Sequence, residues 1–211
     1  MSVAIDKISF VNYRQYGTGQ IHFKTDGANK LSILIAKNGT GKTTLLNAIT
    51  WCLYGQELHL AEGKKALPIV NSSLVHKAQA GEVIPVRVSV EISSDDDNIE
   101  FLRTARFKVK KGENGNNVID SPSALTVTIT PQKGTFKNTV VKTGADADII
   151  VKQYFDEAIF KFYFFDGEKL RDFFTESQAN SIQQSIFNIS QVTLLENAVT
   201  HLARLNSDRT K

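Results

Sequence analysis

The fold is decided by the stretch Ala36-Lys-Asn-Gly-Thr-Gly-Lys-Thr-Thr44. It fits the second half of the pattern G-x-x-x-x-G-K-[ST], with Ala36 in place of the first glycine. In such a loop, successive backbone N–H groups and the start of the following helix form a concave donor surface at the positive end of a helix dipole. The stretch therefore predicts a phosphate-binding loop, or P-loop.

The sequence on both sides of the loop supports this prediction. An apolar run, Leu31–Ile35, precedes the loop, and we expect it to be a strand covered on both faces. A helix is predicted from about Thr43 to Tyr54, because its apolar residues recur at the spacing of one buried helix face. Gly55 is well placed to end that helix. The alternative is a glycine turn that only caps a buried helix, and the order of strand, loop and helix favours the P-loop.

Each residue type in the loop suits the binding of a nucleoside triphosphate. Lys42 is expected to reach the β and γ phosphates, and the Thr43 hydroxyl to ligate Mg²⁺. The predicted cofactors are therefore ATP and Mg²⁺. The residues assigned to the nucleotide cradle are Lys37, Asn38, Gly39, Thr40, Gly41, Lys42, Thr43 and Thr44.

The rest of the chain alternates between strand and helix patterns. Two strands joined by a glycine-containing turn are expected within residues 1–24. Three later runs of alternating apolar and polar residues predict an antiparallel sheet with one wet face. These runs are residues 86–92, 105–110 and 125–130, and polar turn segments at Ser93–Asn98 and Lys111–Ser123 are expected between them.

Helical patterns return toward the C-terminus. A helix is expected from Asp146, and a strand-like run, Phe160–Phe165, then leads to Asp166-Gly167-Glu168. The last helical stretch places leucine and alanine at the 3-4-3 spacing of a coiled coil for less than two heptads. Its members are Leu195, Ala198, Leu202 and Leu205.

Composition describes an ordinary globular chain. The 211 residues are 41% hydrophobic and 22% charged, and a formal net charge of +3 is too small to establish a nucleic-acid partner. Cys52 is the single cysteine, so no internal disulfide exists and a reducing compartment is expected. No apolar stretch approaches the roughly 20 residues that span a bilayer. We therefore expect a cytoplasmic protein without a membrane partner.

Three segments in order resemble a known family. They are Ile8–Tyr16, Asn38–Ile49 and Phe162–Lys169. Together they are similar to the heads of SMC-type ABC ATPases, which include SbcC-like repair proteins, and most similar to the DndD group linked to DNA phosphorothioation and phage defence. The resemblance implies an α/β fold: a P-loop NTPase, the N-terminal lobe of an ABC/SMC-like head, with an antiparallel β subdomain and the start of a coiled-coil helix. The lobe would span residues 1–190 and the root of the coiled coil residues 191–211.

The resemblance also implies roles for single residues. Arg14 would approach the nucleotide phosphates, although an ordinary exposed turn arginine is the alternative. Asp166-Gly167 falls where relatives carry a glutamine-glycine pair, so Asp166 would contact the Mg²⁺ directly or through water. Two other readings stay open: a plain turn, or a Walker B strand with Glu168 as catalytic base.

Several parts of such a head are missing from this sequence. The signature motif, the Walker B Asp-Glu pair and the switch histidine belong to a C-terminal half in this family, so the catalytic residues are expected there. The 211 residues alone should bind ATP weakly and hydrolyse it hardly at all. The implied partners are that C-terminal half, a second head across sandwiched ATP, defence-system proteins, and DNA.

A lysine-rich face is the candidate DNA contact, with ordinary solvated lysines as the alternative. Its members are Lys108, Lys110, Lys111, Lys133, Lys137 and Lys142. Two other functions compete with the DNA-linked ATPase. One is a self-contained P-loop kinase, which would need an arginine-rich lid. The other is a nucleotide-binding adaptor that never hydrolyses ATP.

Overall fold

The computed structural model describes residues 3–23, 32–37, 39–57, 68–112, 115–132 and 138–155. The chain divides into two compact units, Met1–Tyr154 and Phe155–Lys211, and the description below concerns the first. The predictions for Phe160–Phe165, for Asp166-Gly167-Glu168 and for the coiled-coil root at 191–211 lie outside the described residues. The predicted boundary at residue 190 lies there too and stays a prediction.

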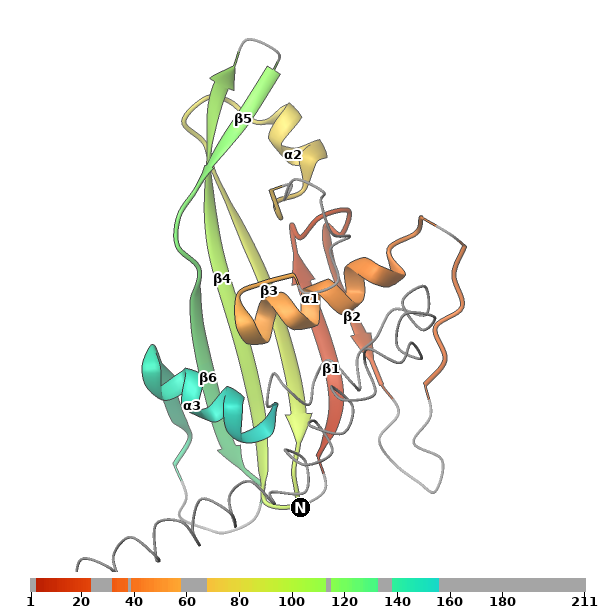
Figure 1. Cartoon of the computed structure of the whole chain (residues 1–211), viewed down its shortest axis with the longest axis vertical. Helices are drawn as coiled ribbons and strands as arrows, with labels where there is room; N and C mark the ends of the chain where they lie inside the picture. Colours follow the sequence, from red (N-terminus) through yellow and green to blue (C-terminus); the bar gives the residue numbers. More distant parts are fainter. Residues whose placement is uncertain are drawn as a thin grey trace, which may run out of the picture. The chain divides into compact units, whose positions relative to one another are not determined.

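Seven strands form one sheet in the order β2-β1-β3-β4-β6-β7, with β5 also paired to β4 (Figure 1). Every pairing between these strands is antiparallel. The strands are β1 (Ala4–Val11), β2 (Thr18–His22), β3 (Val83–Ser93), β4 (Asp97–Gly112), β5 (Gly115–Asp120), β6 (Ala124–Pro131) and β7 (Val140–Thr143). The two N-terminal strands and the antiparallel sheet predicted from the alternating runs are confirmed.

Alternating residues divide the sheet into an inner, apolar face and an outer, polar face. On β3, Val86, Val88 and Val90 are fully buried, whereas Arg87 between them is exposed. β-Branched side chains fit this pleated, half-buried surface well. The predicted wet face is therefore the outer face.

The predicted polar turn segments are wrong in their extent. β4 already begins at Asp97, and β5 lies inside the segment Lys111–Ser123 that was expected to be a turn. β5 is polar because the end of this hairpin has little core to cover. Its asparagines still pair in register with lysines of β4, and Asn116 Nδ2 donates to the carbonyl oxygens of Val75 and Ala78, at 3.0 and 2.8 Å. Hydrogen bonds thus specify this hairpin where apolar alternation gives no signal.

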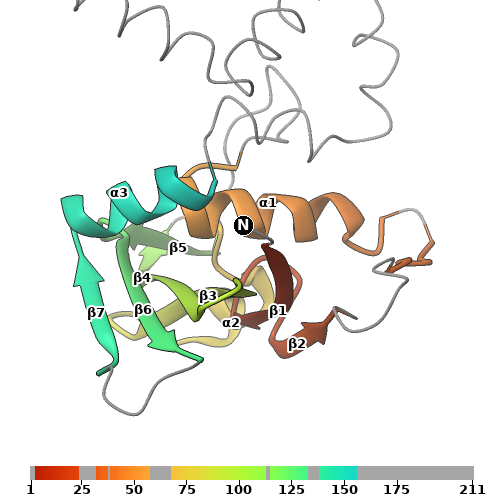
Figure 2. The ribbon, with the colours of Figure 1, turned by 90° about the horizontal axis from the view of Figure 1, so that it is seen from below.

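Two helices cover the inner face, as Figure 2 shows. Helix α1 (Lys42–Tyr54) contacts β3 and β4, and α3 (Ala145–Tyr154) contacts β6 and β7. The short α2 (Ser72–Lys77) lies beside β5. The predicted helices after the loop and from Asp146 are confirmed. None of the helices among the described residues is both long and apolar enough to cross a bilayer.

The C-terminal end of α1 is fixed by a buried arginine from β4. Gly55 ends the helix in the left-handed conformation (φ 74°), and its N–H donates to the Trp51 carbonyl, as predicted. Arg103, only 7% exposed, donates from Nε to the Cys52 carbonyl at 2.8 Å and from Nη2 to the Leu53 carbonyl at 3.1 Å. A cation at this end is also favoured by the helix dipole. Burial raises the pKa of the neighbouring Cys52 thiol to about 12, so this thiol stays protonated at neutral pH.

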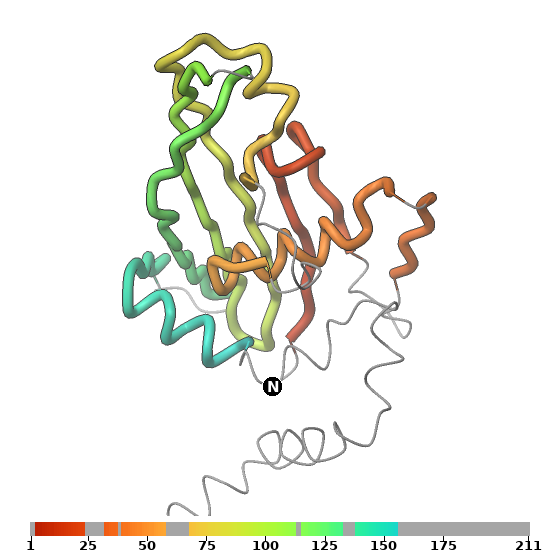
Figure 3. Tube along the Cα trace, turned by 45° about the horizontal axis from the view of Figure 1, so that its top comes forward, coloured from red at the N-terminus to blue at the C-terminus, as the bar shows by residue number. Residues whose placement is uncertain are grey.

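The strand predicted at Leu31–Ile35 is wrong for the residues that the structure describes. Residues 32–37 have no regular secondary structure, and Ile33 and Ile35 are 72% and 92% exposed. Figure 3 shows this segment beside the start of α1 and away from the sheet. A strand covered on both faces needs hydrogen-bonded neighbours at its edges, and the described strands all pair with one another instead.

Replacing Arg103 by methionine should lower the free energy of unfolding by about 2–4 kcal/mol, because it leaves buried carbonyl oxygens at the end of α1 without their charged donor. Urea denaturation measures this change. Arg106→Met is the matched control, since Arg106 lies on the same strand but is exposed on the outer face. Equal losses in the two variants would contradict the role of Arg103.

Candidate functional site

The predicted phosphate loop forms a tight turn that leads directly into α1. Gly39 and Gly41 have φ angles of 79° and 114°, which residues with a side chain rarely adopt. The Thr40 hydroxyl donates to the Lys37 carbonyl oxygen at 2.7 Å and closes the turn. Gly41 is the N-cap of α1. The backbone conformation thus favours glycine at Gly41, the glycine of the motif, and also at Gly39, where the motif allows any residue.

Lys42 folds back over the start of the loop. Its Nζ donates to the carbonyl oxygens of Ala36 at 2.9 Å and Lys37 at 3.1 Å. Both acceptors are neutral, whereas a phosphate oxygen is charged and makes the stronger hydrogen bond with an ammonium group. The ammonium group of Lys42 therefore lies over the loop, where it could exchange these carbonyl oxygens for the oxygens of a bound phosphate.

The start of α1 suits an anion. Its N-cap is a glycine, which offers no side chain to bond the first-turn N–H groups, and its first turn contains no acidic residue. Lys42 is exposed, and Thr43 and Thr44 are half-buried. The structure thus brings the described loop residues together at an electropositive helix end. Asn38 and Asp166 lie outside the described residues.

Arg14 is engaged in a partly buried ion pair with Glu57. Its Nε donates to Glu57 Oε1 at 3.0 Å, its Nη2 pairs with Glu57 Oε2, and its Nη1 donates to the Pro68 carbonyl at 3.4 Å. The Tyr13 hydroxyl also donates to Glu57 Oε1, at 2.5 Å. Burial by itself lowers the pKa of Arg14, but the hydrogen bonds and charge of Glu57 outweigh it and the pKa is raised. Burial and Glu57 together raise the pKa of the Tyr13 phenol.

Glu57 was not among the residues singled out from the sequence. It follows the end of α1 by three residues, and its side chain is only 5% exposed. No local pattern marks it, since its two partners are more than 40 positions away. The approach of Arg14 to nucleotide phosphates stays a prediction.

A protein-family model described as an AAA domain matches residues 7–208. The chain belongs to this family. The AAA domain is a P-loop NTPase domain, here of the SMC- and SbcC-like type, and such domains bind nucleotides. A comparison with curated proteins found no significant match. The family assignment covers almost the whole chain, including the loop, the helix and the sheet described above.

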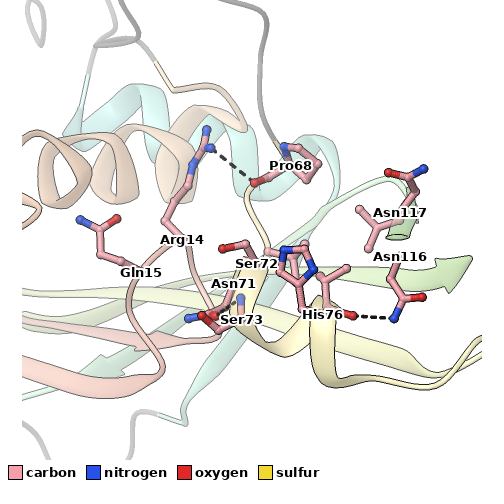
Figure 4. A pocket seen from close by; sticks show the side chains of 12 residues that line it. Arg14, Gln15, Pro68, Asn71, Ser72, Ser73, His76, Asn116 and Asn117 are labelled. Atoms are coloured by element: carbon pink, nitrogen blue, oxygen red, sulfur yellow. Dashed lines mark hydrogen bonds between the residues drawn. The ribbon is translucent and has the colours of Figure 1, made fainter. Parts of the chain in front are cut away.

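A pocket of about 470 Å³ opens beside the Arg14–Gln15 turn of this AAA domain (Figure 4). Its other walls come from residues 68–76 and from β5. Its lining surface is mainly apolar, with Pro68, Val70, Val75 and Val118 in the walls. The polar side chains in these walls are Asn71, Ser72, Ser73, His76, Asn116 and Asn117. Gln15 links the pocket to the phosphate loop, because the Thr44 hydroxyl donates to Gln15 Oε1 at 3.2 Å. The volume lies in the range of small-molecule sites.

The outer face of the sheet carries a basic strip. It is formed by four exposed side chains on β3 and β4: Arg87, Arg106, Lys108 and Lys110. The register places Arg87 opposite Thr104 and Pro85 opposite Arg106, so all four point to the same side. The sequence interpretation had missed both arginines, because it followed lysines alone.

Two of the predicted lysines do not belong to this strip. Lys111 follows Lys110 directly and therefore points to the opposite face. Lys142 of β7 lies opposite the buried Val127 and pairs with Asp146 of α3 at 3.3 Å, so it lies on the inner face. Lys133 and Lys137 lie outside the described residues. As for a metal, the described ranges contain no group of three His, Cys, Asp or Glu side chains suited to bind one.

Glu57→Gln should destabilise the fold by about 2–3 kcal/mol, because the partly buried Arg14 loses a charged hydrogen-bond acceptor. Chemical denaturation checks the loss. Glu91→Gln is the control, because Glu91 pairs with Lys7 at a site that is about one-third exposed, and exposed pairs contribute about 1 kcal/mol or less. If Glu57→Gln is no worse than Glu91→Gln, the ion pair with Arg14 is not a structural element.

Proposed function

We propose that this AAA domain is the ATP-binding N-terminal half of an SMC-like ATPase that acts on DNA. The observation that carries the proposal is the position of Lys42 over the phosphate loop. The helix start at this point has no side-chain cap and no acidic residue in its first turn. A triphosphate bound there would exchange the neutral carbonyl partners of Lys42 for charged oxygens. Thr43 would ligate Mg²⁺, as the motif implies. Asp166 is proposed as a second contact to the metal. The alternative is a Walker B strand at this point, with Glu168 as the catalytic base.

The nucleoside is proposed to lie toward the pocket beside Gln15. Phosphates at the start of α1 leave the base and ribose to extend past that side chain, which borders both places. The pocket offers amide and hydroxyl groups from α2 and its N-cap, Asn71, which suit a base edge or a ribose. Arg14 also lines the pocket, and to approach the phosphates, as proposed, its side chain would have to leave Glu57.

Hydrolysis is proposed to need a complementary C-terminal half. Ile33, Leu34 and Ile35 form an apolar run that is 72%, 49% and 92% exposed, immediately before the phosphate loop. Burying such a run removes a substantial apolar area from water, so a strand from the other half is a favourable partner. The catalytic residues are expected in that half. ATP would then be sandwiched between two such heads.

DNA is proposed to contact the basic strip Arg87, Arg106, Lys108 and Lys110. Four exposed cations on one face of a sheet suit phosphate backbones rather than base reading. The role is proposed to be in defence or in repair, and the similarity of the motifs to the DndD group adds defence-system proteins as proposed further partners.

A self-contained kinase is the second candidate. A kinase closes an arginine-bearing lid over the γ-phosphate. Among the described residues, the one helix between α1 and the strands that follow is the six-residue α2, which contains no arginine. Measuring ATP turnover with and without the complementary half separates the candidates. Turnover that requires the other half supports the SMC-like ATPase. Turnover by the chain alone supports the kinase, and none in either case supports a non-hydrolysing adaptor.

Lys42→Ala should weaken ATP binding roughly 100-fold or more, because a charge-assisted contact to the phosphates is lost. Titration with a fluorescent ATP analogue measures the affinity. Lys152→Ala, which removes an exposed lysine of α3, serves as the control. Unchanged affinity in Lys42→Ala would refute the assignment of the loop.

Replacing Arg106 and Lys108 together by glutamine should weaken binding to duplex DNA and reduce the slope of log K against log salt by about 2, since about one counterion is released per phosphate contact. Fluorescence anisotropy at several salt concentrations gives the slope. Lys142→Gln is the control, because Lys142 is paired on the inner face. A salt slope that does not change in the double variant would exclude the strip as a DNA contact.

A further inference from the structure

The turn between β1 and β2 touches the phosphate loop where the loop becomes helix. The Tyr16 hydroxyl donates to the Gly41 carbonyl oxygen at 2.9 Å. The same oxygen accepts the first hydrogen bond of α1, from the Leu45 N–H, also at 2.9 Å. Tyr16 therefore bonds the one carbonyl that joins the end of the loop to the start of the helix.

Gln15 makes a second contact one turn later. Its Oε1 accepts a hydrogen bond from the Thr44 hydroxyl at 3.2 Å. Gly41 lies directly against both side chains: a Cβ placed on Gly41 would collide with the Gln15 amide and lie 2.7 Å from the Tyr16 hydroxyl. The fit is close enough that the loop and the turn have little room to move independently.

The turn that carries these side chains is itself held firmly. Tyr16 stacks on Phe10 of β1 with ring centroids 4.7 Å apart, and Phe10 is only 3% exposed. Asn12 Nδ2 donates to the Pro85 carbonyl on β3 at 2.9 Å. Asn12 and Arg14 both have positive φ angles, 57° and 51°, a conformation that costs energy in residues other than glycine. Burial also raises the pKa of the Tyr16 phenol, so its hydroxyl is protonated and able to donate at neutral pH.

We propose that Gln15 and Tyr16 are positioning residues for phosphate binding: they hold Gly41 and Thr44 so that the first turn of α1 and the Thr43 hydroxyl face the bound triphosphate and its metal. This inference rests on the proposed function of the loop. Neither side chain needs to touch the nucleotide phosphates.

Tyr16→Phe tests the hydroxyl alone, since the ring and its stacking on Phe10 are kept. The dissociation constants of ATP and of inorganic tripolyphosphate are measured by competition with a fluorescent nucleotide. Both should rise about 3- to 10-fold, the usual effect of one lost hydrogen bond. The matched control is Tyr154→Phe on α3, which removes a hydroxyl that is hydrogen-bonded to Ser94 in the turn between β3 and β4. The control should bind both ligands as the unchanged chain does, with a similar melting temperature to Tyr16→Phe.

Gln15→Met tests the second contact. It should raise the dissociation constants of ATP and of inorganic tripolyphosphate by a similar factor of about 3 to 10, because the Thr44 hydroxyl loses its acceptor and the first turn of α1 is held less firmly. Gln15 also lines the pocket, so a loss confined to ATP would place its effect on the nucleoside and contradict the positioning role. Normal affinities in both variants would overturn the proposal, as would a lowered melting temperature with unchanged affinity. If the phosphate loop is not the nucleotide site, Lys42→Ala will bind ATP normally. If Lys42→Ala loses ATP binding but Tyr16→Phe binds ATP normally, only the positioning role is refuted.

Discussion

Burial of α1 on the inner face of the sheet fixes the position of the phosphate loop, because the loop leads directly into this helix at Gly41. The helix places Ile49 and Cys52 against β3 and β4, and each is at most 4% exposed. Arg103 holds one end of this helix and the Tyr16 turn braces the other. The orientation of the electropositive helix start is therefore set by side chains from outside the loop: those of the sheet, Arg103 and the Tyr16 turn.

The sheet separates two tasks on its two faces. Its inner face supports α1 and α3 with apolar side chains, and its outer face presents the basic strip of β3 and β4. Strand alternation makes this division possible, because neighbouring residues such as Val86 and Arg87 point in opposite directions. The helix that begins at the proposed nucleotide site thus packs on one face of β3 and β4, and the proposed DNA contact lies on the other face of the same strands.

The exposed run Ile33–Ile35 is the clearest departure from an ordinary folded surface. Apolar side chains this exposed, three in a row, more often mark an interaction site than a finished surface. The run continues directly into the phosphate loop at Ala36. A partner strand paired with this run would order the entrance to the loop, so partner binding and nucleotide binding would support each other.

The sequence alone determined the phosphate loop, the helix that follows it, its end at Gly55 and the two-faced sheet, because glycine conformation, helical period and strand alternation are local signals. It did not determine the Glu57–Arg14 pair, the Tyr16 contact to Gly41 or the side on which Lys142 lies. Those depend on which distant segments meet, and only the tertiary structure brings them together. The run Leu31–Ile35 shows the same limit. Its apolar composition favours burial, but a strand forms there only if a neighbouring strand supplies hydrogen bonds.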